Sequence, residues 1–93
     1  AAILQMTRML AIEWAPHGLR GNAVAPGRVN TPSPSRAATT SDPKYMQAMA
    51  DRVPLRRLAT AEDVAGAVSY LAGPHGEFIT GQTIAVDGGL TVY

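Results

Sequence analysis

The stretch NAVAPGRVNT, from Asn22 to Thr31, decides how the rest of the chain is interpreted. It begins as a short apolar run, typical of a strand that is buried on both faces of a parallel sheet. Pro26 should end that strand because proline has no N–H for a central ladder, and Gly27 allows another group to come close. Ligands bind open α/β sheets at the carboxyl ends of the strands, so we predict a ligand at the loop that follows.

The composition indicates one small globular domain and excludes several classes of protein. Of the 93 residues, 46% are hydrophobic and 16% are charged, which excludes a disordered chain. A net charge of +1 argues against nucleic acid as a partner. The chain has no cysteine, and its two histidines lack ligand spacing, so we expect no metal site. The sequence shows no membrane-spanning stretch or signal peptide, which favours a cytoplasmic protein without membrane partners.

Helical and strand patterns alternate along the chain. Residues 1 to about 15 are rich in alanine, leucine and methionine and predict a helix, which Gly18 ends in a left-handed turn. Its polar residues do not occupy one side, so we expect cover on more than one side, from a sheet alone or also from a second subunit. Strands are predicted over 19–25 and 83–86. Gly21 should weaken the first strand or accommodate a bulky neighbour.

The segment after Thr31 is dense in serine, threonine and proline, which predicts a loop. Asp42 and Pro43 then have the pattern of a helix start, with a helix predicted from Lys44 to about Arg52. This helix carries two methionines, which adapt to irregular surfaces. Taken by itself, this pattern favours an ordinary surface excursion whose methionines fill a gap in the core.

A second helix is predicted to start at Thr60, because Thr60 and Asp63 have the spacing of a capping box. Arg57 is interpreted as a structural charge close to this helix start. Asp87 comes directly after the second predicted strand. The glycines that follow it favour close approach of another segment, such as a neighbouring chain.

Three motifs together resemble the short-chain dehydrogenase/reductase family. They are the stretch from Gly18 to Thr31, the triplet Thr80-Gly81-Gln82 and the run Val86-Asp87-Gly88-Gly89. The resemblance covers nearly the whole chain, although Arg56 stands where the family commonly has glycine. It implies an α/β fold in which residues 1–93 form the C-terminal part of a single dinucleotide-binding domain, a Rossmann-like doubly wound parallel sheet. It also implies a substrate lid over about 32–58, and a structural role for Asp87, which would tie down the backbone of a turn.

The same resemblance implies that NAD or NADP binds at the loop after the first strand. The implied cofactor-binding residues are Pro26, Gly27, Val29 and Thr31. Val29 would offer backbone groups to the nicotinamide carboxamide, and Thr31 would add a hydroxyl near the carboxamide and the pyrophosphate. The chain lacks the family's serine and its tyrosine-lysine pair, so no catalytic residue is assigned. We expect a fragment, inactive alone, in which the catalytic lysine immediately precedes Ala1.

The sequence therefore predicts part of an NAD(P)-dependent oxidoreductase that acts on a small-molecule carbonyl or alcohol. The resemblance implies a homo-oligomer, dimer or tetramer, in the full-length protein. The alternative is a non-catalytic remnant or oligomerisation module that keeps only the helix surface used for assembly. Binding of NAD(P)H by a longer protein would favour the enzyme, whereas self-association without cofactor binding would favour the module.

Overall fold

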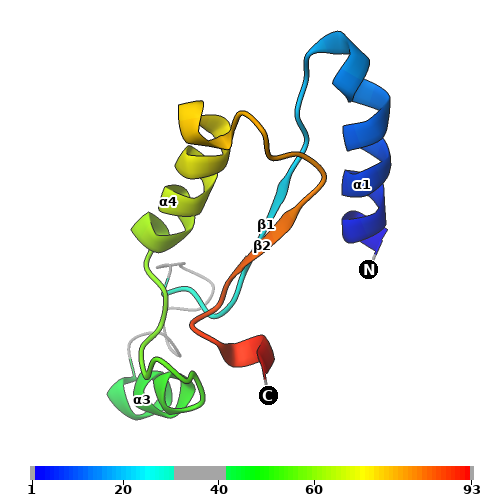
Figure 1. Ribbon diagram of the computed structural model, residues 1–93. Coiled ribbons are helices and arrows are strands. Elements are labelled where there is room, and N and C mark those ends of the chain that lie inside the picture. Colours follow the sequence, from blue (N-terminus) through cyan, green and yellow to red (C-terminus); the bar gives the residue numbers. More distant parts are fainter. Residues whose placement is uncertain (1, 31–41, 93) are drawn as a thin grey trace.

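The computed structural model describes residues 2–30 and 42–92. The helices are α1 (Ala2–Trp14), α3 (Pro43–Asp51) and α4 (Ala61–Ala72), and the strands are β1 (Ala23–Pro26) and β2 (Thr83–Val86). Short 3₁₀ turns cover Ala15–His17, Pro74–Gly76 and Leu90–Val92. The two strands are parallel and lie between α1 and α4, one helix on each side (Figure 1). The architecture is α/β, as the sequence predicts.

Strand β1 starts later than predicted and includes the proline. It pairs with β2 from Ala23, opposite Thr83, to Pro26, opposite Val86. Donors from β1 to β2 alternate along the strand, and Gly27 rather than Pro26 donates to the Val86 carbonyl, at 3.0 Å. The nitrogen of Pro26 therefore faces away from β2, which is why proline is tolerated at this position.

The residues before β1 are held by side-chain contacts and by one backbone hydrogen bond, from the Gly81 amide to the Gly21 carbonyl at 2.7 Å, instead of a regular strand ladder. The Asn22 side chain donates to the Ile79 carbonyl at 2.9 Å and accepts from the Gln82 amide at 3.0 Å. A β-carbon at Gly21 would lie 3.7 Å from the indole ring of Trp14, so a bulky neighbour does occupy the space beside this glycine. The predicted strand over 19–25 is wrong before Ala23 because these contacts replace regular pairing.

Local capping signals set the helix ends. Gly18 has φ +76° and donates to the Ala15 carbonyl at 3.0 Å, which ends the turn after α1. The Asp42 carboxylate accepts from the Lys44 amide at 3.0 Å at the start of α3. At the start of α4, Thr60 and Asp63 form the predicted capping box. These helix boundaries are confirmed to within one residue.

Helix α4 packs against both strands and is attached to β1 by an arginine. The Arg20 guanidinium donates to the carbonyls of Leu71 and Gly76, both at 2.6 Å, at the C-terminal end of α4. A cation at this end of a helix satisfies carbonyls that have no partner within the helix. Leu71 is buried in this region. The contact fixes the start of β1 against α4 and thus the direction in which β1 delivers the following loop.

Candidate functional site

Gly27, the first residue after β1, brings the predicted ligand loop against the turn that follows β2. A β-carbon at position 27 would lie 2.8 Å from the β-carbon of Asp87 and 2.9 Å from its α-carbon. Gly27 does not have a positive φ. Glycine is therefore required here for space and not for an unusual backbone conformation.

Val29 lies two residues further along and forms an isolated parallel bridge with Ala59. The flanking residues supply its hydrogen bonds: the Asn30 amide donates to the Ala59 carbonyl, and the Ala59 amide donates to the Arg28 carbonyl, both at 2.9 Å. In this geometry the N–H and C=O of Val29 itself point away from Ala59. Neither group has a hydrogen-bond partner among residues 2–30 and 42–92.

Thr31 lies outside the described residues. The structure therefore brings Pro26, Gly27 and Val29 together at the carboxyl end of β1 and gives no position for the fourth predicted residue. Pro26 contributes to the ladder through its place opposite Val86. Among these residues, Val29 is the one whose backbone donor and acceptor both lack a partner among residues 2–30 and 42–92.

Asp87 forms the turn that supports this loop. Its carboxylate accepts from the Gly89 amide at 3.0 Å, from the Thr91 amide at 3.1 Å and from the Thr91 hydroxyl at 2.5 Å. The hydroxyl of Thr91, followed by the Gly89 amide, holds the pKa of Asp87 below its usual range. A carboxylate whose oxygens are engaged in this way is structural, and the prediction that Asp87 ties down a turn is confirmed.

The two glycines after Asp87 approach the segment that follows α3. A β-carbon at Gly88 would lie 2.6 Å from Cγ1 of Val53, and one at Gly89 would lie 3.1 Å from Cβ of Pro54. The Leu55 amide also donates to the Gly88 carbonyl at 3.1 Å. The predicted close approach is confirmed, and the segment approached is residues 53–55 of this chain.

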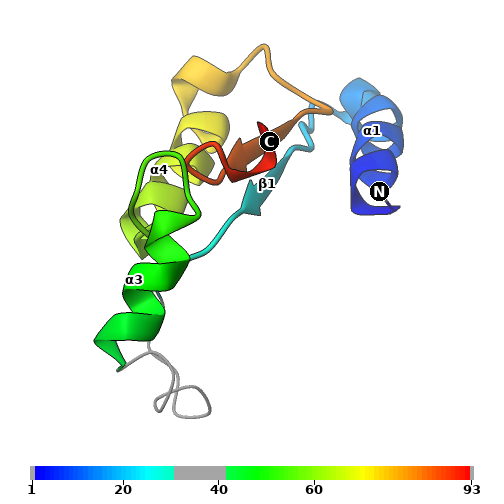
Figure 2. The same ribbon diagram turned by 90° about the horizontal axis from the view of Figure 1, so that it is seen from below.

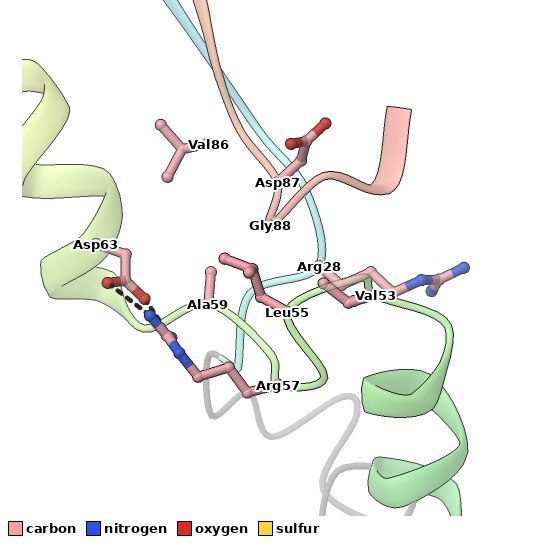
Figure 3. A pocket seen from close by; sticks show the side chains of 9 residues that line it. All are labelled: Arg28, Val53, Leu55, Arg57, Ala59, Asp63, Val86, Asp87 and Gly88. Carbon is pink, nitrogen blue, oxygen red and sulfur yellow. Dashed lines mark hydrogen bonds and ion pairs between the residues drawn. The ribbon is translucent and has the colours of Figure 1, made fainter. Parts of the chain in front are cut away.

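A cavity of about 170 Å³ lies where these segments meet (Figure 3). It is lined by Arg28, Val53, Leu55, Arg57, Ala59, Asp63, Val86, Asp87 and Gly88. Small-molecule sites usually measure roughly 300–1,000 Å³, so the cavity is too small for a dinucleotide. In Figure 3 the Arg28 guanidinium points away from the cluster formed by Arg57 and Asp63. We interpret the cavity as a packing gap beside the loop and not as the ligand site.

Arg57 and Asp63 form an ion pair with a closest N–O distance of 2.7 Å on one side of this cavity. The hydrogen bond from Arg57, followed by the backbone hydrogen bond from Thr60, holds the pKa of Asp63 far below its usual range. The same contact with Asp63 raises the pKa of Arg57. The pair fastens the segment after α3 to the start of α4, and its charges satisfy each other. The interpretation of Arg57 as a structural charge is confirmed.

Sequence reasoning missed Ala59, whose backbone orients Val29. A single bridge between residues thirty positions apart has no periodicity that a sequence could display. Within the described ranges, no group of three or more histidine and carboxylate side chains could hold a metal ion. In that same part of the chain, none of the helices is both long enough and apolar enough to cross a bilayer.

Residues 1–91 match the family model described as enoyl-(acyl carrier protein) reductase. With the parallel strands and the Pro-Gly loop in place, this match shows that the chain belongs to the short-chain dehydrogenase/reductase family.

The chain is 45% identical to a tropinone reductase homolog of Arabidopsis thaliana, over 98% of this chain and 29% of that protein. It is 40% identical to glucose 1-dehydrogenase of Gluconobacter oxydans, over 99% of this chain and 34% of that protein. The chain thus spans about a third of the length of the curated relatives it matches.

Solved structures show the same fold. A short chain dehydrogenase family protein of Francisella tularensis superposes with a TM-score of 0.85 at 30% identity, covering 99% of this chain and 41% of that one. A gluconate 5-dehydrogenase of Burkholderia cenocepacia, solved in complex with NADP and tartrate, superposes with a TM-score of 0.81 at 30% identity, covering 99% and 35%. The Rossmann-like fold class predicted from the sequence is confirmed.

Proposed function

We propose that residues 1–93 form the carboxyl-terminal part of an oxidoreductase that transfers a hydride between NAD or NADP and a small-molecule carbonyl or alcohol. The observation that carries the proposal is the backbone of Val29, whose N–H and C=O have no partner among the described residues. A primary carboxamide offers one acceptor oxygen and two donor hydrogens, which complement these two groups. The relatives support the same activity, because they include a glucose 1-dehydrogenase and a gluconate 5-dehydrogenase solved with NADP.

In this proposal the chain binds and orients the nicotinamide end of the cofactor. The cofactor supplies the hydride chemistry when bound. Gly27 allows the loop to reach its place, Ala59 fixes the direction of the Val29 groups, and the Thr31 hydroxyl adds a further contact. The serine, tyrosine and lysine that the family uses would come from outside residues 1–93, so this segment has no catalytic residue of its own.

A proline substitution tests the Val29 contact directly. Val29→Pro removes the backbone N–H, and Val29→Ala keeps the N–H while shortening the side chain. Losing one hydrogen bond costs about 1 kcal/mol, so we expect roughly fivefold weaker binding of NADPH or NADH for Val29→Pro. Val29→Ala should stay within about twofold of the parent under the same reasoning. Binding is measured by titrating cofactor fluorescence, and urea unfolding shows whether each variant keeps its fold.

Two outcomes would overturn this function. If a folded Val29→Pro variant binds both cofactors as tightly as Val29→Ala, the backbone contact is wrong. If the full protein that carries this sequence, without any substitution, binds neither NADPH nor NADH, the oxidoreductase assignment fails as a whole.

One observation favours the alternative function, an oligomerisation module without catalysis. The helix α1 exposes several large apolar side chains: Ile3 at 67%, Met6 at 53%, Met9 at 61% and Ile12 at 77%. An apolar surface of this kind favours association with another subunit or another part of the fold. Sedimentation that shows self-association in a protein without cofactor binding would favour the module. Both properties together would favour a homo-oligomeric enzyme.

A further inference from the structure

The turn formed by Asp87 and Gly88 contacts two segments that are far apart in the sequence. On one side, Gly27 lies so close to Asp87 that a β-carbon at position 27 would be 2.8 Å from that of Asp87. On the other side, the Gly88 carbonyl accepts from the Leu55 amide at 3.1 Å, and Val53 lies over the α-carbon of Gly88. The turn therefore separates the proposed nicotinamide loop from the segment after α3 by a fixed distance.

A third contact closes these segments into a ring. Val29, in the loop, forms its bridge with Ala59, at the end of the segment that follows α3. The loop 27–30, the segment 53–59 and the turn 87–88 are thus each connected to the other two. A ring of short backbone contacts resists relative movement of its parts better than any single contact does.

Helix α3 depends on this ring for its position. None of the α3 residues is buried, whereas Val53, two residues after its end, is only 3% exposed. Figures 1 and 2 show α3 beyond the carboxyl ends of the strands and away from α1. The last backbone hydrogen bonds of the helix run through Arg52 and Val53 to the carbonyls of Met49 and Ala50. The contact between Val53 and Gly88 therefore sets the position of α3.

We infer that the Asp87–Gly88 turn is a positioning element that holds α3 at a fixed place relative to the nicotinamide loop, with Val53 as its anchor. The inference rests on the proposed function, because the loop's role as a cofactor contact comes from it. In this inference Asp87 and Gly88 are positioning residues, because they act through their contacts with other parts of the chain. They act on α3 through the contact with Val53 and the hydrogen bond from the Leu55 amide.

Hydrogen exchange of the α3 amides tests the anchor in the full protein that carries this sequence. Val53→Ala removes the methyl groups that lie over Gly88, and Val92→Ala makes the same truncation at a valine that is 84% exposed. We expect exchange in α3 to accelerate on the order of tenfold in Val53→Ala, with exchange in α4 unchanged and no effect of Val92→Ala. Equal acceleration of α3 and α4 would indicate general destabilisation and would overturn the inference, as would no acceleration of α3.

A double substitution tests the contact with Gly88 itself. Gly88→Ala places a β-carbon 2.6 Å from Cγ1 of Val53, so alone it should accelerate α3 exchange. Gly88 also has φ +63°, where alanine is strained whatever its neighbours, so that part of the effect remains in the Val53→Ala background. The clash with Cγ1 of Val53 is relieved there, so the second substitution should add less acceleration than it causes alone. Additive effects would overturn the inference.

Measuring NADPH binding by the Val53→Ala variant separates this inference from the proposed function. Val53→Ala should change the Kd for NADPH by less than about twofold, because the anchor lies on the α3 side of the turn and leaves Gly27 in place. If the unmodified protein binds no NADPH and no NADH, the proposed function fails, while the exchange rates still decide whether Val53 positions α3. A large loss of NADPH affinity in Val53→Ala with unchanged α3 exchange would overturn the positioning role.

Discussion

Replacing Gly27 with alanine should be among the most damaging single-methyl changes in this chain. The new β-carbon would lie 2.8 and 2.9 Å from two carbon atoms of Asp87. Carbon atoms pack at about 3.5–4.0 Å, so the shortfall is roughly 0.6–1.2 Å. Asp87 cannot move aside freely, because its carboxylate is tied to the amide and hydroxyl of Thr91. Overpacking of this kind costs about 1–3 kcal/mol of folding free energy.

The loop after Gly27 must shift to relieve the rest of this overlap, so the affinity for NADPH should fall together with the stability of the fold. Urea unfolding followed by circular dichroism measures the free energy of unfolding, and a fluorescence titration measures the Kd for NADPH. Gly66→Ala is the matched control, because no atom outside the helix backbone lies within 4 Å of a β-carbon at that position in α4. Alanine in an exposed helix interior stabilises by about 0.5–1 kcal/mol relative to glycine.

The opposite signs of the two substitutions make the test decisive. Gly27→Ala should lower the free energy of unfolding, while Gly66→Ala should raise it or leave it unchanged. If Gly27→Ala proves as stable as the parent and binds NADPH equally well, the close contact with Asp87 does not exist in solution. The explanation of this glycine by lack of space would then be refuted.

Three further predictions follow from contacts at the helix start and in the loop. Thr60→Ala should destabilise the protein by about 1 kcal/mol through loss of the α4 cap, measured by urea unfolding; an unchanged midpoint would contradict the capping box. The pKa of Asp63 in the folded state lies below its ordinary value of 3.8 because of Arg57. The ion pair therefore stabilises the fold fully at a pH above 3.8, and this stabilisation is lost as the pH falls toward the folded-state pKa. Asp63→Asn should flatten the acid limb of a stability–pH curve, and an identical limb in parent and variant would contradict this. Thr31→Ala removes one hydrogen bond, worth about 1 kcal/mol of cofactor binding, so it should raise the KM for NAD(P)H while the free energy of unfolding changes by less than this amount. A large loss of stability with an unchanged KM would refute the proposed hydroxyl contact.

The elements that sequence alone placed well are those whose signals are local. The Asp42 cap of α3 involves residues two apart, and the Thr60 capping box involves residues three apart. Such pairs can be read directly from the chain, because their geometry needs only a few residues to adopt helical angles. Strand β2, predicted over Thr83–Val86, was also confirmed, since its alternating pattern lies between clear turn residues.

The features that sequence could not place depend on contacts between distant residues. The start of β1 is set by the Asn22 side chain and its partners some sixty positions later. That the N–H and C=O of Val29 point away from the neighbouring segment, with no partner among the described residues, is visible only once Ala59 is known to lie beside it. Arg56 is an intermediate case: the family resemblance implied glycine at this position, and the φ of +62° observed for Arg56 is in the left-handed region that glycine adopts without strain.

The parallel pairing of β1 with β2 has a consequence for how this fold tolerates change. Ala23 pairs with Thr83, sixty residues later, so a long stretch of chain is already closed into a loop by the sheet. The entropy of closure grows only with the logarithm of loop length, and ten additional residues between β1 and α3 would cost only ~0.1 kcal/mol. Changes of length between β1 and α3 that keep the contacts of Gly27 and Val29 therefore cost little in closure entropy.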